Sequence, residues 1–339
     1  MSQSNLKIGL IKNEFIDYQS YLYYELGKYA FEKNIEFEIK IIKNNPNEFD
    51  IIFGEYNELL KFNQNQIDYP YEIEEFYKNN SINITYSTLP LDLDTFLIVS
   101  REDVKKINTL EDLSTYYDPL KYTMGISLRY PLTLSKFFFY NIDNNSYNVN
   151  DISSESVLIH LKKIYKNLNK NILYSDYLEF INSYESNENI FTLFGDGVLL
   201  NKDFSYKYFQ LFPQSKYQWD KKNGLFNKRQ DINPYSYFGF SAYINNSKNI
   251  GFLCHLVKED IRIESFKKFN IQLSPLSYNE VSSISKNLPE KYIEILKKKN
   301  KYISYNENRY NKKLHIDLID NIVNEKKLIE EYNSPYLDN

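Results

Sequence analysis

Carboxylate, amide and aromatic side chains follow two of the predicted strands in the first third of the chain. Asn13 and Glu14 come directly after the first strand, and Glu55 and Tyr56 come after the third. Carboxylates accept hydrogen bonds from sugar hydroxyls or from a ligand amine, and an amide both donates and accepts. These four residues are therefore candidates for a polar ligand site. An ordinary acidic helix start is the alternative for Glu55.

A second group of candidates lies in the middle of the chain. Ser127, Arg129 and Tyr130 stand between a predicted strand and the start of the next helix. Backbone N–H groups and a guanidinium at such a place could hold an anionic group or a hydroxyl, with a surface salt bridge as the alternative for Arg129. Asp196 lies in a Gly-Asp-Gly turn, which allows close approach of a ligand but also forms for backbone reasons alone.

The only tryptophan, Trp219, is a candidate for stacking on a sugar face or a cation. A role in the core or in a surface loop is the alternative. The aromatic content of 17% is not itself evidence for a sugar site. Gly, Pro and Ala are scarce while Tyr, Phe, Asn, Lys and Ile are abundant, which is the codon signature of an AT-rich bacterial genome.

Signatures of catalysis and of metal or cofactor binding are missing from the sequence. We find no GxSxG, HExxH, Walker or GxGxxG pattern and no Cys–His nucleophile pattern. The three histidines are scattered, and a single cysteine, Cys254, excludes an intramolecular disulfide and a cysteine-based zinc site. The sequence therefore predicts no cofactor, no metal and no catalysis, although a fold alone does not decide that last point.

Length and charge set further bounds. The chain has 339 residues, which predicts one large domain or two lobes of ordinary size. Its net charge of −4 argues against nucleic acid as a partner, and no apolar run approaches the roughly 18 residues needed to span a bilayer. No export signal precedes the first predicted strand, so we expect either a cytoplasmic protein or one from which a signal has been removed.

The elements that must position these residues alternate between strand and helix, an order that predicts parallel α/β sheets. The apolar residues of 203–235 show no clear helical or strand periodicity, and this segment is expected to form a long, structured connection. Thr109 is predicted to be a helix N-cap. The patterns predict strands at 6–11, 36–43, 49–53, 95–100, 122–127 and 237–244 and helices at 17–33, 56–62, 157–168, 249–268, 289–299 and 312–332.

The ordered set of these segments resembles the extracellular solute-binding proteins of ABC importers, of the two-lobed type in solute-binding family 1. The resemblance covers most of residues 6–285. No single motif in it is specific, and apart from the segment 209–213, residues 203–235 and the tail after 300 have no close counterpart. The segments that carry it are FDIIFG at 49–54, FLIVS at 96–100, VKKINTLEDL at 104–113, FQLFP at 209–213, FGFSAYINN at 238–246, GFLCHL at 251–256 and LSPL at 273–276.

The resemblance implies a type II periplasmic-binding-protein-like fold with mixed, mainly parallel sheets and a ligand cleft between lobes. Lobe one would comprise 1–95 plus 240–300, lobe two 96–239, and 301–339 would be a C-terminal helical extension. Tyr235 and Tyr237 would flank the return crossover and line the cleft. A small polar ligand, with carbohydrate favoured, would be captured by hinge closure without catalysis.

The same resemblance implies ABC permease subunits as partners, a monomeric state and an extracytoplasmic location, as a periplasmic protein or a lipid-anchored one. Alternatives are a polyamine or other organic-cation binding protein, a ferric-ion binding protein and a cytoplasmic enzyme on the same fold. The tyrosine pairs Tyr23-Tyr24 and Tyr116-Tyr117 are of the kind that ferric-binding relatives use, but neither falls where those relatives place theirs.

Overall fold

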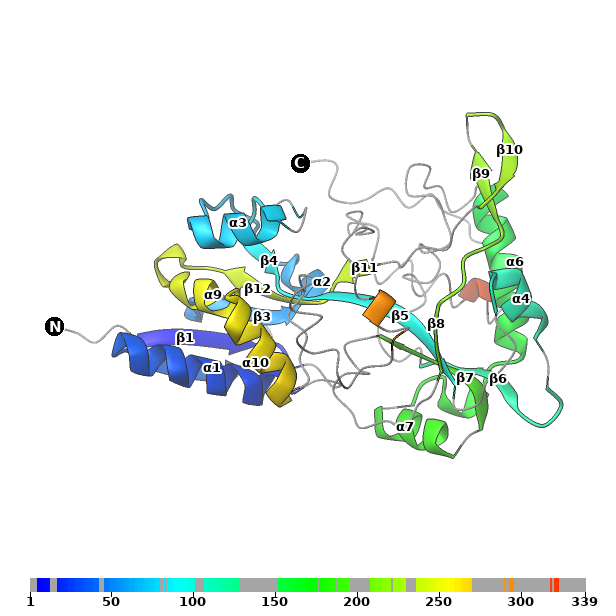
Figure 1. Cartoon of the computed structure of the whole chain (residues 1–339), viewed down its shortest axis with the longest axis horizontal. Coiled ribbons are helices and arrows are strands. Elements are labelled where there is room, and N and C mark those ends of the chain that lie inside the picture. The colour runs from blue at the N-terminus through cyan, green and yellow to red at the C-terminus, as the bar shows by residue number, and fades with distance from the viewer. Residues whose placement is uncertain are drawn as a thin grey trace. The chain divides into compact units, whose positions relative to one another are not determined.

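The structure is a computed structural model, and it describes most of the chain up to residue 269 together with short pieces beyond (Figure 1). For a few residues inside helices and strands, Trp219 and Tyr237 among them, it describes the backbone only. The described residues are 5–12, 17–42, 46–79, 82, 84–100, 107–116, 118–127, 152–175, 177–186, 188–195, 208–220, 222–229, 236–269, 290, 293–295, 318 and 320–322.

The chain divides into two compact units, each assembled from separate stretches of sequence. The first unit comprises Met1–Thr95, Gly195–Phe204 and Ser236–Ile303. The second comprises Phe96–Phe194, Ser205–Tyr235 and Ser304–Asn339. The chain therefore leaves the first unit inside a strand, β5 (Leu93–Ser100). It returns to that unit at Gly195–Phe204 and again at Ser236, where β11 (Ser236–Phe238) begins.

The first unit is built on a mixed five-stranded sheet in the order β2-β1-β3-β12-β4. The first three strands in the chain run parallel, as the strand–helix alternation predicts, whereas β12 runs antiparallel to its neighbours on both sides. Because parallel strands end at the same edge of a sheet, the residues that follow β1 and β3 lie at one edge. The strands are β1 (Asn5–Leu10), β2 (Glu36–Ile41), β3 (Ile51–Glu55), β4 (Thr88–Pro90) and β12 (Phe240–Ile244).

Helix α1 (Tyr18–Lys33) supplies much of the apolar cover for this sheet. Its Leu22 and Leu26 are fully buried in one core cluster with Ile8 of β1 and Phe53 of β3. Asp17 caps its start, and Asn34 ends it in the left-handed conformation with φ 50°. The other elements of this unit are α2 (Tyr56–Leu59), α3 (Tyr71–Asn79), α9 (Gly251–Leu256), α10 (Glu259–Phe269) and the short 3₁₀ turns Pro46–Glu48 and Ser247–Asn249.

The second sheet has the order β11-β5-β7-β6, with β8 pairing antiparallel to β5. β6 and β7 are parallel, so this sheet is also mixed. A separate two-stranded hairpin, β9 and β10, follows β8 along the chain. The elements are β6 (Tyr122–Gly125), β7 (Asn189–Gly195), β8 (Tyr208–Leu211), β9 (Tyr217–Asp220), β10 (Leu225–Lys228), α4 (Leu110–Thr115), α6 (Ile152–Lys166), α7 (Tyr177–Glu185) and the 3₁₀ turn Lys170–Ile172.

Two predicted elements are interrupted in the structure. The strand expected at 237–244 is two strands, β11 and β12, separated by Gly239. The helix expected at 249–268 is also two, α9 and α10, and the buried Arg262 guanidinium donates to the Val257 carbonyl oxygen at the break. None of the helices in the described residues is long and apolar enough to cross a membrane.

Candidate functional site

Glu55 and Tyr56 lie at the carboxyl end of β3, as the sequence predicts. Glu55 is the last residue of the strand, is half-buried and occupies the N-cap position of α2. The Tyr56 ring lies 5.1 Å from the ring of Phe238, and the Tyr56 N–H donates to the Gly239 carbonyl oxygen at 2.9 Å. The backbone of β11–β12 therefore holds this pair at the edge of the sheet.

The start of α1 belongs to the same edge because it follows β1. The Asp17 carboxylate accepts from the backbone N–H of Ser20 at 3.1 Å and from its hydroxyl at 2.6 Å, and the hydroxyl bond lowers the pKa of Asp17. Tyr18, the first helical residue, stacks on Phe240 with ring centroids 3.6 Å apart. Since Phe240 is paired with Glu55 in the sheet, aromatic packing ties the helix start to the end of β3.

Asp92 is a third feature of this edge, and the sequence analysis did not select it as a candidate. It is buried, its N–H donates to the Phe240 carbonyl oxygen at 3.0 Å, and its own carbonyl oxygen accepts from the Gly239 N–H at 3.0 Å. A Cβ atom on Gly239 would stand 3.0 Å from Asp92 Oδ2, so glycine leaves room for the carboxylate. Nothing in the local sequence marks Asp92, because its position depends on strands almost 150 residues apart.

We name this group the β3-edge site: Asp17, Tyr18, Glu55, Tyr56, Asp92 and Gly239. It combines carboxylates with aromatic rings. Such a set can accept hydrogen bonds from hydroxyls or from an amine and can pack against an apolar face. The backbone of Tyr237 is close by, in β11 opposite Asp94.

Ser127 lies two residues beyond β6 in the second unit and is buried. Its hydroxyl donates to the Ser175 carbonyl oxygen at 3.1 Å, so its single proton is already used within the fold. The backbone of Trp219 lies in β9, opposite Phe226 of β10. The remaining candidates lie outside the described residues: Asn13, Glu14, Arg129, Tyr130, Asp196 and Tyr235.

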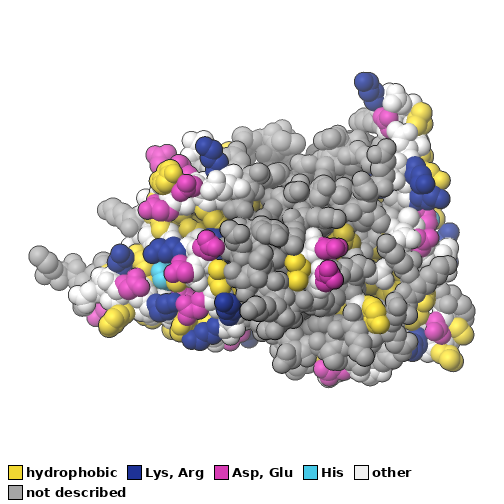
Figure 2. All heavy atoms as spheres, viewed as in Figure 1, with side chains coloured by type: hydrophobic (Ala, Val, Ile, Leu, Met, Phe, Trp, Pro, Cys, Tyr) yellow, Lys and Arg dark blue, Asp and Glu magenta, His cyan; other side chains and the backbone are white. Residues whose placement is uncertain are grey.

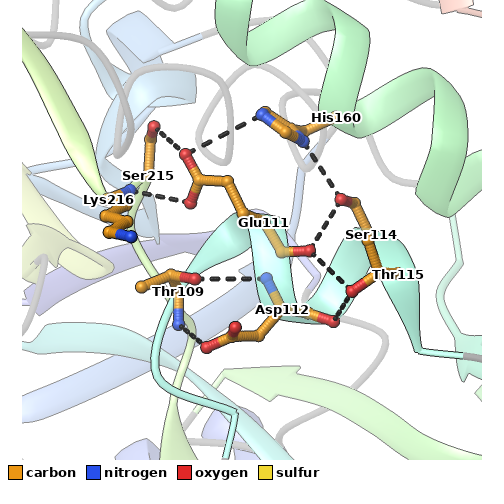
Figure 3. A network of polar contacts seen from close by, with 8 residues as sticks. All are labelled: Thr109, Glu111, Asp112, Ser114, Thr115, His160, Ser215 and Lys216. Atoms are coloured by element: carbon orange, nitrogen blue, oxygen red, sulfur yellow. Dashed lines mark hydrogen bonds and ion pairs between the residues drawn. The ribbon is translucent and has the colours of Figure 1, made fainter.

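A serine, a histidine and a carboxylate meet in the second unit in an arrangement that could suggest nucleophilic catalysis (Figure 3). Ser114 Oγ lies 3.0 Å from His160 Nδ1, and His160 Nε2 lies 3.8 Å from Glu111 Oε1. The Ser114 hydroxyl, however, donates to the Glu111 carbonyl oxygen at 2.8 Å. A hydroxyl has one proton, so while Ser114 donates to that carbonyl oxygen it does not donate to His160, and the ring can then only donate to Ser114 from Nδ1.

The same residues instead join three segments of the second unit. Glu111 accepts from the Ser215 hydroxyl and from the Lys216 N–H, each at 2.7 Å. Thr109 and Asp112 form a reciprocal capping box at the start of α4, which confirms the predicted N-cap. Burial lowers the pKa of His160, and the Glu111 charge partly opposes that shift. We call this set the Glu111 network: Thr109, Glu111, Asp112, Ser114, His160, Ser215 and Lys216. Its contacts link α4 to α6 and to the segment just before β9, which is a structural role.

Among the residues the structure describes, no three His, Cys, Asp or Glu side chains are grouped so that they could hold a metal ion. The hydroxyls of Tyr23 and Tyr24 each have protein acceptors, the Ile39 carbonyl oxygen at 3.3 Å and Glu264 Oε1 at 2.6 Å. His255 is buried in α9 and pairs with the fully buried Glu25 at 3.1 Å. Both histidines in the described residues thus have structural partners.

The chain is similar over nearly its whole length to solved binding proteins. The GacH receptor of Streptomyces glaucescens, solved unliganded and with acarbose, gives a TM-score of 0.67 at 11% identity, covering 96% of this chain and 95% of that one. Maltose-bound MalE3 of T. maritima gives 0.67 at 12%, with 95% and 96% covered. Apo ferric ion-binding protein A of Pasteurella haemolytica gives 0.58 at 10%, with 96% and 99% covered.

Comparison by sequence alone finds no matching family model and no matching curated protein. The structural similarities therefore define the fold. They confirm the expected mixed α/β architecture of the type II periplasmic-binding-protein class.

Proposed function

We propose that this protein is the substrate-binding component of an ABC importer, capturing a small polar ligand by hinge closure without catalysis. The observation that carries the proposal is the similarity, over about 95% of both chains, to binding proteins solved with acarbose and with maltose. A carbohydrate is the favoured ligand. The carboxylates and rings of the β3-edge site suit hydroxyl groups and the apolar face of a sugar ring.

The predicted lobes and site residues form part of this proposal. Lobe one comprises 1–95 and 240–300, lobe two 96–239, and 301–339 forms an extension. The ligand contacts are Asn13, Glu14, Glu55, Tyr56, Ser127, Arg129, Tyr130, Asp196, Trp219, Tyr235 and Tyr237. The placement of Glu55 and Tyr56 at a strand end, where open α/β sheets bind ligands, supports the assignment for those two.

An organic cation, such as a polyamine, is the second candidate ligand. Carboxylates next to aromatic rings also form a favourable environment for an amine, and the β3-edge site holds Glu55 and Asp92 beside Tyr56. Similarity to the Pasteurella haemolytica protein keeps ferric ion as a third candidate. A cytoplasmic enzyme on the same fold is the rival of a different class.

The proposed role implies permease subunits as partners, a monomer and a location outside the cytoplasm. These assignments follow from the function and share its test. A component of an importer should be exported and should be encoded next to permease genes. A cytoplasmic enzyme should instead stay in the cytoplasm and convert the compound that it binds.

Thermal unfolding in the presence of sugar, amine and ferric-citrate panels tests the proposal. A ligand that binds only the folded state raises the melting temperature by mass action. We expect stabilisation by one carbohydrate class, and expect Glu55→Gln to reduce it. Glu36→Gln, at the opposite end of the same sheet, is the matched control. Stabilisation by phosphorylated or dicarboxylate compounds alone would contradict the assignment.

A further inference from the structure

The hairpin formed by β9 and β10 is an element of the second unit that hydrogen bonds hold at its turn and at its base. Asp220 organises its turn: the carboxylate accepts from the N–H groups of Lys222 and Asn223 and from the side-chain amides of Asn223 and Asn227, at 2.6 to 3.2 Å. Gly224 supplies the left-handed residue with φ 63° that the turn needs. The hydrogen bonds to the carboxylate lower the pKa of Asp220, so its charge is held inside the turn.

The base of the hairpin is fastened to the rest of the unit. The Arg229 N–H donates to the Lys216 carbonyl oxygen at 2.9 Å and closes the ladder. The Lys216 N–H donates in turn to Glu111 of the Glu111 network at 2.7 Å (Figure 3). In Figure 1 the two strands run beside α6 and extend past it. The hairpin is therefore preorganised to present its surface without an ordering cost on contact.

That surface is both apolar and basic. Tyr217, Leu225 and Phe226 are 44%, 47% and 39% exposed, and every residue of β10 is exposed. Residues 216–229 contain five basic residues and one acidic residue, a formal charge of +4, in a chain whose net charge is −4; the remainder therefore carries −8. Figure 2 shows dark-blue basic and yellow hydrophobic side chains together on this part of the molecule.

We propose that the β9–β10 hairpin docks on an anionic phospholipid membrane. Basic side chains are attracted to acidic headgroups, and Tyr, Phe and Leu side chains enter the boundary between headgroups and acyl chains. A purely polyanionic partner would use the charge but not the exposed apolar residues. The rest of the chain carries a net charge of −8, so its overall charge does not favour an anionic surface and the attraction must come from local basic groups such as those of this hairpin. This contact is additional to the lipid anchor or permease considered from the sequence, and it does not depend on which ligand the protein binds.

Co-sedimentation of the full chain with vesicles tests the proposal. We expect binding to vesicles of phosphatidylglycerol and phosphatidylcholine, little binding to phosphatidylcholine alone, and weakening by added salt. Lys222→Glu and Phe226→Ser should each lower the partition coefficient by about fivefold or more. The matched controls are Lys33→Glu and Phe31→Ser on α1, which change exposed residues of the same types outside the hairpin.

Circular dichroism and thermal unfolding of each variant separate a surface effect from a folding defect. Absence of binding to the anionic vesicles would overturn the proposal. So would equal binding to neutral vesicles, or equal losses in the control variants. Binding to soluble heparin that is as strong as binding to vesicles and unaffected by Phe226→Ser would overturn it in favour of a polyanion.

Discussion

His160 is a residue whose protonation the surrounding structure controls. Burial lowers its pKa below 6.5, so the folded state favours the uncharged ring. An unfolded chain then binds the proton more readily, and the contribution of this group to stability is complete above pH 6.5 and is lost as the pH falls through the folded pKa. We expect the free energy of unfolding of His160→Gln to fall less steeply than that of the wild-type protein as the pH is lowered below 6.5.

Nuclear magnetic resonance titration of the His160 ring checks the cause. Glu111 raises the pKa of His160 and Lys163 lowers it, so Glu111→Gln should shift the titration midpoint down and Lys163→Gln should shift it up. A wild-type midpoint above 6.5, or shifts in the same direction in both variants, would show that burial and these two charges do not set the pKa.

Asp17 provides a second test at the scale of one residue. Its carboxylate caps α1, and replacing such a cap by alanine costs about 1 kcal/mol. We expect Asp17→Ala to lower the free energy of unfolding by that amount in urea titrations, and Asp17→Asn, which keeps an acceptor, to lower it less. The hydrogen bond from Ser20 lowers the pKa of Asp17. The difference in free energy of unfolding between the wild-type protein and Asp17→Ala should therefore shrink as the pH falls through the folded pKa of Asp17. Equal stability of all three proteins would remove the capping role.

Sequence reasoning predicted the strand-end position of Glu55 and Tyr56 but not the burial of Ser127, for a physical reason. Glu55 and Tyr56 follow an apolar strand, and the end of a strand can be read from local pattern alone. The burial of Ser127 against the Ser175 carbonyl oxygen depends on a contact 48 residues away, which no local pattern encodes. The aromatic stack of Tyr18 on Phe240 is a still longer-range example.

Two glycines allow a matched test at the scale of elements. A Cβ atom on Gly125 in β6 would lie 2.5 Å from the Asn189 amide nitrogen, inside a buried hydrogen-bonded cluster with Asn169 and Ser183. We expect Gly125→Ala to destabilise the protein by about 1–3 kcal/mol. Gly27, within α1, has no neighbouring atom within 4 Å of such a Cβ, so Gly27→Ala should stabilise it by about 0.5–1 kcal/mol. Thermal and urea unfolding measure both. Similar effects of the two substitutions would contradict the packing described for β6 and β7.

The Glu111 network supports a further prediction about the hairpin. Glu111→Ala removes the acceptor of both the Ser215 hydroxyl and the Lys216 N–H. We expect faster amide hydrogen exchange at Lys216 and Arg229, with exchange in β1 and β3 unchanged as an internal control. Unchanged exchange at Lys216 would mean that the hairpin base is held by other contacts.

Element types were easier to predict than element boundaries. Alternating or continuous apolar runs identified β1, β2, β5 and β12, and the apolar face of 17–33 identified α1. The helices α3 and α7 were not predicted. The break between α9 and α10 was also missed, because the sequence there has neither Gly nor Pro, and Arg262 binds the Val257 carbonyl oxygen from a turn further on.

At the scale of the whole molecule, the order of strands and helices predicted the fold although no family model matches the sequence. Proteins with 10–12% identity share this architecture, so it depends on the pattern of apolar segments and turns rather than on particular residues. The ligand could not be predicted in the same way. Specificity depends on a few side chains brought together from distant segments, and 17% aromatic residues in an AT-rich composition give no guide to which ones.

Isothermal titration calorimetry with the most stabilising carbohydrate, followed by mass analysis of the recovered ligand, tests the proposed role. A binding component should take up one ligand per chain and release it chemically unchanged. The Glu55→Gln variant should bind the ligand about 1–3 kcal/mol more weakly, and the Glu36→Gln variant should bind it as the wild-type protein does. Absence of saturable binding to every carbohydrate and amine tested, or recovery of a converted product, would contradict the assignment of this chain as a non-catalytic solute-binding protein.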